Sequence, residues 1–459
     1  MNYKKSLTML AALGLMALNA TSGNIDSATA RATAAKFLQQ KQTTMFKSAP
    51  STSLKLTHAE ASSVDGNAYY VFNMDGGGWV IVAGDDHANQ ILAYSNTGSF
   101  DMNSAPAAAK GYLKKYKAQI DFMKNYKGEV VPYKMPKRTT VVEPLLKSKE
   151  WAQQSPFNYQ CVFNGQACSV GCAGLAMAQI LNYWEYPKEC SGLSGYSPSW
   201  NLSVPSLPAT TFDYDLILDQ YTYWNDEGKL AWLDGVTDDN KQEVAKLCRY
   251  ASQSCLMNFS PDGSGSNVTK QYKGFLALGY DAGARLLGIE AWPTRETWNT
   301  EDYTDEEWMS MMNAELEAGH PLPYSSEGFS DGHAFVVDGV DADGLYHVSW
   351  GWYGRGDGWF QHGAFNVTVQ GQYMEFNESL FMVVDLFPYP GYEPPTHEDP
   401  VALRGDVNAD GEVNISDLTF LIDYLLGVGT SETADCNMDG EVDIDDVTSL
   451  VDYLIKSEW

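Results

Sequence analysis

The segment NGQACSVGCAGLAMAQILNYW (residues 164–184) predicts a buried helix that begins beside a cysteine. Apolar residues follow Gly171 and Cys172 at helical spacing: Leu175, Met177, Ile180, Leu181 and Trp184. A cysteine in the first turn of a helix feels the positive end of the helix dipole, which favours the thiolate. Gln166 lies six residues earlier, where its side-chain amide could join the Cys172 backbone N–H in holding a developing oxyanion. We therefore predict that Cys172 is a nucleophile.

A thiol nucleophile needs an imidazole, and the segment DGHAFVVDGVDADGLYHVSWGWYGRGDGWF (331–360) supplies one. Apolar runs on either side of a turn at 340–344 predict two antiparallel strands. With the turn centred near Asp341, we expect His333 opposite Ser349, to within a residue or two. That register would bring Trp350 and Trp352 close to the imidazole, where their rings would exclude water and hold its orientation.

Two alternatives to this histidine stay open at the level of sequence. His347, on the returning strand, is a rival base, and His333 could be a structural core histidine. The glycine before His333 and the two facing tryptophans favour His333.

Several longer patterns in the chain are similar to those of one known family. They are GQ-x5-C (165–172), AMAQI (176–180) followed by Tyr183 to Pro187, GHAFV-x-DG (332–339) and YHV-x-WGW (346–352). With them, the chain resembles the streptopain family of papain-like cysteine peptidases, which includes interpain of Bacteroidales. GGWVIVAGDD (77–86) and ILAYSNTGSFD (91–101) resemble the inhibitory propeptide of that family. The resemblance covers about residues 25–387.

The resemblance implies a fold, a reaction and a set of site residues. The fold is α+β: a papain-like catalytic domain with a helical part and an antiparallel β part, preceded by a small α+β pro-domain. The implied reaction is hydrolysis of peptide bonds in proteins or peptides through a Cys172–His333 thiolate–imidazolium pair and a thioester, with no catalytic cofactor. Gln166 becomes the oxyanion donor, and Trp350 buttresses the pair. The family usually has Asn before the first Trp of WGW, and Ser349 takes that place here as a third group. A Ser/Gly-rich loop near the substrate cleft corresponds to Gly263, Ser264, Gly265 and Ser266.

The ends and joints of the chain predict its domain organisation. Lys4 and Lys5 followed by an apolar run (7–18) predict a signal peptide at 1–22, and therefore secretion. An inhibitory propeptide (23–140) would follow, with helices near 28–40 and 107–126 and a hairpin of strands 68–73 and 79–83. A polar linker (134–140) predicts a maturation cut near 138–141. The peptidase domain then spans 141–388, and a Pro-rich linker spans 389–400.

The last segment, residues 401–459, carries 14 Asp and Glu against 2 Lys and Arg, and it contains a repeat. DVNADGEVNISD (406–417) recurs as DCNMDGEVDIDD (435–446), and both copies fit a twelve-residue calcium loop. The predicted ligands of two calcium ions are Asp406, Asn408, Asp410, Glu412, Asn414 and Asp417, then Asp435, Asn437, Asp439, Glu441, Asp443 and Asp446. An apolar helical run follows each loop, at 418–426 and 447–455. The pair resembles a dockerin, a small all-α module that binds a cohesin-like scaffold; a calcium-stabilised stalk without a partner is the alternative.

Composition excludes some functions. The formal charge of −29 disfavours nucleic acid and anionic membranes as partners. No segment after the signal is long and apolar enough for a membrane span. The seven cysteines are an odd number for an exported chain, so at least one thiol should be free. For Cys168, Cys248 and Cys255 we expect buried, inert thiols.

Three functions are compatible with these features. The first is a secreted cysteine endopeptidase made as a zymogen with a C-terminal docking module. The second is a catalytically silent scaffold or inhibitor with a protease-like fold. The third is a Cys–His amidase that acts on cell-wall peptides. The presence of Cys172, His333 and Gln166 favours an enzyme over the silent protein.

Overall fold

The computed structural model describes residues 23–45, 53–125, 131–132, 140–148, 150–199, 202–225, 227–280, 283–289, 303, 305–326, 332–362, 367–368 and 380–388. In the C-terminal module it describes residues 404–405, 407, 413, 415–426, 434, 436–437 and 442–456. The predicted signal peptide and the Pro-rich linker lie outside the described residues. The fold is of mixed α+β type, as predicted.

A ten-stranded antiparallel sheet runs through both the N-terminal domain (residues 23–125) and the β part of the following domain. Its strands, in spatial order, are β1 (Leu54–Ala61), β2 (Asn67–Met74), β3 (Trp79–Ala83), β4 (Ile91–Ser95), β18 (Gly358–Phe360), β17 (Tyr346–Ser349), β16 (His333–Val340), β15 (Leu322–Ser326), β20 (Leu380–Val384) and β14 (Arg285–Ile289). The two halves join where β4 pairs with β18, with Tyr94 opposite Trp359 and Ala93 opposite Phe360.

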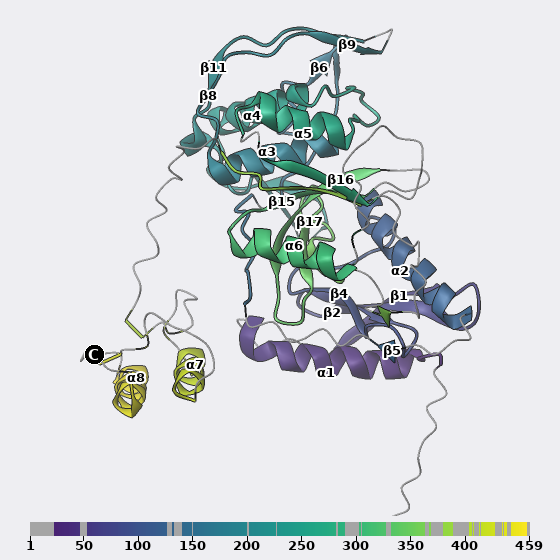
Figure 1. The fold of residues 1–459 in the computed structure, drawn as a ribbon, viewed down its shortest axis with the longest axis vertical. Coiled ribbons are helices and arrows are strands. Elements are labelled where there is room, and N and C mark those ends of the chain that lie inside the picture. Colours follow the sequence, from purple (N-terminus) through teal and green to yellow (C-terminus); the bar gives the residue numbers. More distant parts are fainter. Residues whose placement is uncertain are drawn as a thin grey trace, which may run out of the picture.

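The N-terminal half of the sheet is covered on both faces because its strands alternate two apolar sets. Tyr70 and Phe72 belong to the core under α1 (Ser27–Met45), whereas Tyr69 and Val71 belong to the core under α2 (Ala107–Asn125). Figure 1 shows α1 along the outer face of this half. The two helices and the hairpin predicted for this region are confirmed.

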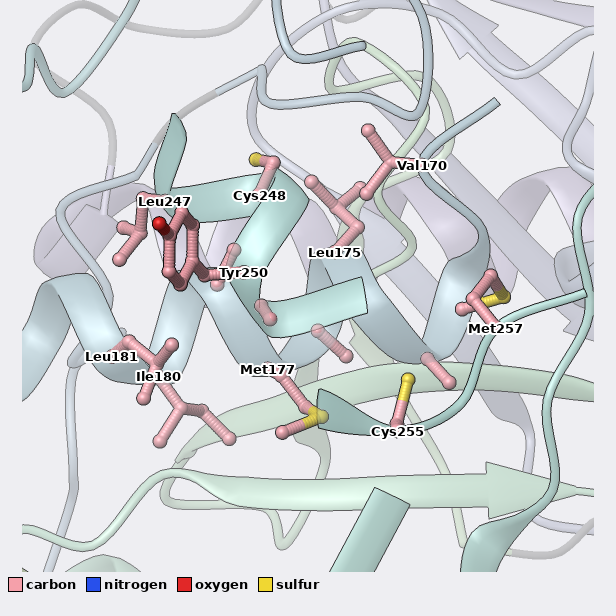
Figure 2. Packing of buried hydrophobic residues seen from close by; sticks show 14 of the residues in the cluster. Val170, Leu175, Met177, Ile180, Leu181, Leu247, Cys248, Tyr250, Cys255 and Met257 are labelled. Atoms are coloured by element: carbon pink, nitrogen blue, oxygen red, sulfur yellow. The ribbon is translucent and has the colours of Figure 1, made fainter. Parts of the chain in front are cut away.

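The helical part of the second domain is a bundle of α3 (Cys172–Trp184), α4 (Asp238–Ser254) and α5 (Val268–Ala277), seen at the upper end of Figure 1. Their apolar side chains interdigitate in one core (Figure 2). Helices α3 and α4 approach so closely that a Cβ on Gly174 would lie 2.2 Å from Ser252 Oγ. This approach needs glycine at 174 and fixes α3 against α4.

Helix α6 (Asp305–Glu317) packs on the other half of the sheet, which runs from β18 to β14, through buried Trp308, Met312 and Leu316. Short elements complete the domain: β5 (Val131–Pro132), β6 (Val162–Phe163), β7 (Gln166–Ala167), β8 (Glu189–Cys190), β9 (Tyr196–Ser199), β10 (Leu202–Val204), β11 (Thr210–Thr211), η1 (Tyr214–Leu216), β12 (Thr222–Trp224), β13 (Leu230–Trp232) and β19 (Val367–Thr368). None of the helices in the described part of the chain has the length and apolar composition to cross a membrane.

The C-terminal module contains α7 (Ile415–Leu425) and α8 (Ile444–Lys456), one after each predicted calcium loop. The two helices share a small core that includes Leu421, Cys436 and Leu450. The helices predicted after both loops are therefore confirmed, and each begins slightly earlier than the apolar pattern indicated.

Candidate active site

Cys172 is the first residue of α3, and the local sequence makes it the accessible end of a buried helix. Residues 173–181 of α3 are all buried, whereas Cys172 is partly exposed. Gly171 caps the helix at φ 83°, and a Cβ there would lie 2.5 Å from Met257 Sδ. The Gly171 N–H donates to Ser169 Oγ at 3.2 Å. The predicted start of the helix at the cysteine is thus confirmed.

His333 is the first residue of β16, and its imidazole forms a hydrogen bond with the Cys172 side chain. Burial alone would raise the pKa of Cys172. The charge and hydrogen bond of His333, with the backbone groups of Ala334 and Ala173, lower that pKa to about 7. Burial would lower the pKa of His333, but Cys172 and the carbonyl of Trp350 together raise it. Each group therefore stabilises the charged form of the other.

The second ring nitrogen of His333 faces the backbone. Nε2 of His333 lies 3.2 Å from the carbonyl oxygen of Trp350. The Trp350 backbone N–H donates to Asp357 Oδ1 at 2.9 Å, and its indole Nε1 donates to Gly356 O at 2.9 Å. Trp350 is 1% exposed, and its carbonyl, its backbone N–H and its indole N–H each have a hydrogen-bond partner that fixes the residue. Sequence analysis missed Asp357, whose only signal is its place in a Gly-rich turn.

The predicted register between β16 and β17 was wrong by three residues. Val336, rather than His333, lies opposite Ser349, and His333 pairs with Ser326 of β15. The cause is the position of the turn: Val340 pairs with Tyr346, so the turn is centred on Asp343 rather than on Asp341, and the irregularity between Val337 and Gly339 takes back one residue of the shift. The indole of Trp350 consequently packs against Phe335, Phe360 and Tyr112, and its carbonyl is the part that meets His333.

Ser349 and Trp352, the other two residues predicted from this segment, lie in different surroundings. Ser349 is buried, and its Oγ accepts a hydrogen bond from Gln179 Nε2 of α3 at 3.1 Å. Trp352 is 40% exposed, and its backbone pairs with that of Ala152. Gln179, the one polar residue in the buried run 173–181 of α3, was another signal that sequence analysis did not use.

Gln166 lies on an exposed hairpin that precedes the nucleophile. Strands β6 and β7 pair Phe163 with Gln166, and the two-residue turn between them is Asn164–Gly165. Both turn residues have positive φ, 51° and 76°, as a type I′ turn requires. Gln166 is exposed to solvent at the end of this hairpin.

The predicted Ser/Gly loop is bound to the segment that leads into α3. Ser264 is buried; its Oγ donates to Ser169 O at 2.7 Å, and its N–H donates to Ser169 Oγ at 3.2 Å. The backbone of Gly265 pairs with that of Asn258, and Ser266 Oγ donates to Cys255 O. Gly263 is exposed at the tip of the loop. The loop therefore lies beside Cys172 and holds in place the segment that leads into α3.

His347, the rival base, belongs to a separate cluster. Its Nδ1 lies 2.6 Å from Asp338 Oδ1, and its ring packs edge-on against Trp359. Burial opposes the charged form, yet Asp338 raises the pKa of His347. The partner of this imidazole is a carboxylate, and Cys172 is the partner of His333.

The N-terminal domain contacts the strands and loops that carry this site. Lys41 Nζ lies 2.9 Å from Asp341 Oδ2 in the β16–β17 turn, and Tyr94 donates to the same oxygen at 2.8 Å. Lys41 also reaches Asp343 at 2.8 Å. The hydroxyl of Tyr116 donates to Gln361 O at 2.6 Å. With the ring of Tyr112 against Trp350, these contacts join the two domains directly behind the site.

In the calcium loops, the described ligand candidates are Asp417, Asn437, Asp443 and Asp446; the other eight predicted ligands lie outside the described residues. Asp417 and Asp446, the last residue of each loop, are both 0% exposed. Asp446 accepts the N–H of Asn437 through Oδ1 and that of Asp443 through Oδ2. A buried carboxylate is costly without a counter-charge, so these two residues fit a bound cation.

A thiol and an imidazole that stabilise each other's charge at a helix N-terminus are the two groups that a cysteine peptidase needs. The model of the Peptidase C10 family matches residues 151–360 of the chain. Residues 22–120 match the Spi protease inhibitor model, and residues 404–455 match the Dockerin type I domain.

Several known proteins are similar to this chain over much of its length. Streptopain of Streptococcus pyogenes is 29% identical over 326 residues, which cover 67% of this chain and 77% of the relative. The thiol protease/hemagglutinin PrtT of Porphyromonas gingivalis is 26% identical over 74% of this chain and 38% of its own length. The structure of a prointerpain A fragment from Prevotella intermedia is 26% identical, covers 74% of this chain and all of that fragment, and superposes with a TM-score of 0.57.

Proposed function

We propose that this cysteine peptidase is a secreted endopeptidase made as a zymogen, with Cys172 as nucleophile and His333 as general base and acid. The observation that carries the proposal is the pairing of the two side chains at the start of α3, where the pKa of Cys172 falls to about 7. A thiolate is therefore present at neutral pH without an external base.

The reaction follows from this pair. The Cys172 thiolate attacks the peptide carbonyl, and the negative charge moves to the carbonyl oxygen. The Cys172 backbone N–H and the amide of Gln166 are the proposed donors to that oxyanion. His333 protonates the departing amine, and a thioester forms on Cys172. Water, deprotonated by His333, then hydrolyses the thioester and releases the second product.

The Trp350 carbonyl takes the role of third group in this proposal. It accepts from Nε2 of His333, which leaves Nδ1 for the exchange with Cys172. Asp357 supports it from the side of the Trp350 N–H. Ser349 acts one step further away, because its hydroxyl is engaged by Gln179.

Latency is proposed to reside in residues 23–140, with Lys41, Tyr94 and Tyr116 as the contacts that hold them. Maturation would cut near 138–141, and Val141 is 44% exposed at the end of that stretch. The C-terminal module is proposed to bind two calcium ions and a cohesin-like partner, as dockerins in general do.

One experiment separates this proposal from a silent scaffold and from an amidase. The purified chain is labelled with an epoxide inhibitor of thiol peptidases, and casein cleavage is measured in the native protein and in Cys172→Ala. The proposal expects labelling at Cys172 and cleavage that the substitution abolishes. Labelling without casein cleavage would favour the amidase, and the absence of labelling would favour the scaffold. Self-maturation fails if Cys172→Ala is processed at the native rate in isolation.

A further inference from the structure

Two cysteines lie opposite each other in the hairpin that carries Gln166. Strands β6 and β7 pair Val162 with Ala167, so the next pair outward is Cys161 with Cys168. The Cys168 N–H donates to Cys161 O at 2.8 Å, which continues the ladder by one step. Such a hydrogen-bonded pair has Cα atoms about 5.5 Å apart. Disulfides span Cα distances of roughly 4.4–6.8 Å, so the backbone spacing fits a bridge.

Both side chains point to the same, inner face of the hairpin. Cys161 is 0% exposed and Cys168 3%, whereas Val162, the next residue along the strand, is 52% exposed. Burial raises the pKa of the Cys161 thiol to about 12; nearby Arg249 opposes the rise, and the neighbouring Cys168 adds to it. The two sulfur atoms are therefore near enough to interact electrostatically.

We propose that Cys161 and Cys168 form a cross-strand disulfide when the chain folds in an oxidising environment. Each thiol loses its proton, one S–S bond forms, and the two electrons pass to a low-molecular-weight disulfide such as oxidised glutathione. That disulfide is cleaved to two thiols, which balances the exchange. The bond forms while the hairpin is still open, and burial then shields it from reductants.

The bridge would close an eight-residue ring that contains Gln166 and its turn. The hairpin has only two residues in each strand, and Gln166 is exposed at its end. Closing the ring fixes this residue relative to Cys168, four positions before the nucleophile. This positioning effect rests on the proposed role of Gln166 in the oxyanion hole, whereas the bond itself does not.

Cys248 on α4 is the competing partner. It is fully buried, burial raises its pKa, and Cys161 adds to that rise, so these two thiols are also neighbours. The register of the hairpin favours Cys168, because its backbone is already paired with that of Cys161. Pairing Cys161 with Cys168 also leaves Cys172 as a free thiol.

Peptide mapping tests the bond without any activity measurement. Full-length Cys172→Ala protein is refolded with reduced and oxidised glutathione, alkylated in denaturant and digested with chymotrypsin. Cleavage after Tyr159, Phe163 and Leu175 places the two cysteines on separate peptides, 160–163 and 164–175. The proposal expects these peptides as one linked species that separates on reduction. Two individually alkylated peptides, or a link from 160–163 to the Cys248 peptide, would overturn it.

Kinetics test the positioning effect separately. The Cys161→Ser/Cys168→Ser double variant is compared with the native chain, each normalised by active-site titration with the epoxide inhibitor. We expect kcat to fall about threefold to tenfold, a fraction of the roughly 10²-fold loss on removal of one oxyanion donor. In a chain that carries Gln166→Ala, adding the Cys161→Ser/Cys168→Ser substitutions should leave kcat unchanged. Cys248→Ser is the control and should leave kcat unchanged; an unchanged kcat in the double variant would refute the positioning effect.

Discussion

The imidazole of His333 is oriented by the backbone, because its Nε2 lies 3.2 Å from the carbonyl oxygen of Trp350. A carbonyl can only accept, so Nε2 must carry a proton and Nδ1 is the nitrogen left for Cys172. A side-chain amide in this position could be lost by a single substitution. A main-chain carbonyl cannot be, and its placement depends instead on what holds Trp350.

Replacement of Ser349 tests whether the backbone alone is sufficient. Ser349→Ala should lower kcat/KM by less than about tenfold, since the hydroxyl contacts Gln179 and the imidazole keeps its carbonyl partner. Loss of the orienting group of a catalytic imidazole costs up to about 10⁴-fold. Steady-state cleavage of a peptide substrate gives the comparison, with Tm as a check of folding. A loss on the order of 10³ would make Ser349 itself the third group.

The low pKa of Cys172 should appear in its reaction with iodoacetamide. We expect the alkylation rate to rise with a midpoint near pH 7, because His333 stabilises the thiolate against the opposing effect of burial. In His333→Ala burial is opposed only by the backbone groups of Ala334 and Ala173, so the midpoint should move up from pH 7 toward the ordinary thiol value of 9.0. His320→Ala serves as the control, and its alkylation midpoint should equal that of the native protein. An unchanged midpoint in His333→Ala would show that the two groups are not paired.

Asp357 should make stability depend on pH. Burial raises the pKa of Asp357 to about 7; the Trp350 N–H and His347 oppose the rise, and Asp338 and Glu150 add to it. The folded state then holds a proton that the unfolded state, with an ordinary value of 3.8, has released. Stability from this group is therefore lost as pH rises through the window from 3.8 to 7.

Asp357→Asn keeps an acceptor for the Trp350 N–H and removes the titration. The Tm of Asp357→Asn minus that of the native chain should be larger at pH 8 than at pH 5. Differential scanning calorimetry at the two pH values measures this difference. Equal Tm shifts at both would mean that Asp357 titrates normally.

The ion pair between Lys41 and Asp341 should control how firmly the N-terminal domain is held. Both groups are buried, and removal of one partner of a buried pair costs about 3–5 kcal/mol. Lys41→Met should therefore give a zymogen that matures faster and shows higher basal activity. Lys36→Met, on an exposed site of the same helix, is the matched control. Identical maturation of the two variants, followed by gel electrophoresis over time, would exclude this contact as a latch.

Removal of calcium should affect one end of the chain only. Without the ion the clustered carboxylates repel, so EDTA should expose the C-terminal module to proteolysis while casein cleavage stays within about twofold. Asp446→Asn should weaken calcium binding, measured by titration calorimetry. Asp452→Asn changes an exposed carboxylate on the same helix and should bind as the native chain does. Calcium-independent resistance to proteolysis would contradict two functional loops.

Sequence alone predicted the elements that depend on local pattern. The start of α3 at Cys172 follows from a glycine before an apolar helical run, β2 and β3 follow from strand-like runs joined by a Gly-rich turn, and α2 follows from helical spacing. What it missed depends on tertiary contact. The β16–β17 register depends on the centre of the turn, which lies at Asp343 rather than near Asp341, so His333 was placed opposite the wrong residue.

The support of the site could not be predicted for the same reason. Gln179 forms a hydrogen bond with a side chain 170 positions away in the sequence, and Asp357 forms one with a backbone N–H 7 positions away. Nothing in a polar residue's own neighbourhood tells which group it will meet. Cys172 and His333 could be proposed from sequence because a nucleophile and a base have few candidates, whereas the orienting carbonyl belongs to a group that every residue carries.

The pairing of β4 with β18 gives the proposed maturation a second consequence. Release of residues 23–140 would break a shared sheet and turn β18 from an interior strand into an edge strand, with Trp359 and Phe360 newly exposed. Unpaired strand boundaries attract other strands. The mature peptidase should thus be the more aggregation-prone and heat-sensitive form, and the precursor the form suited to storage and transport.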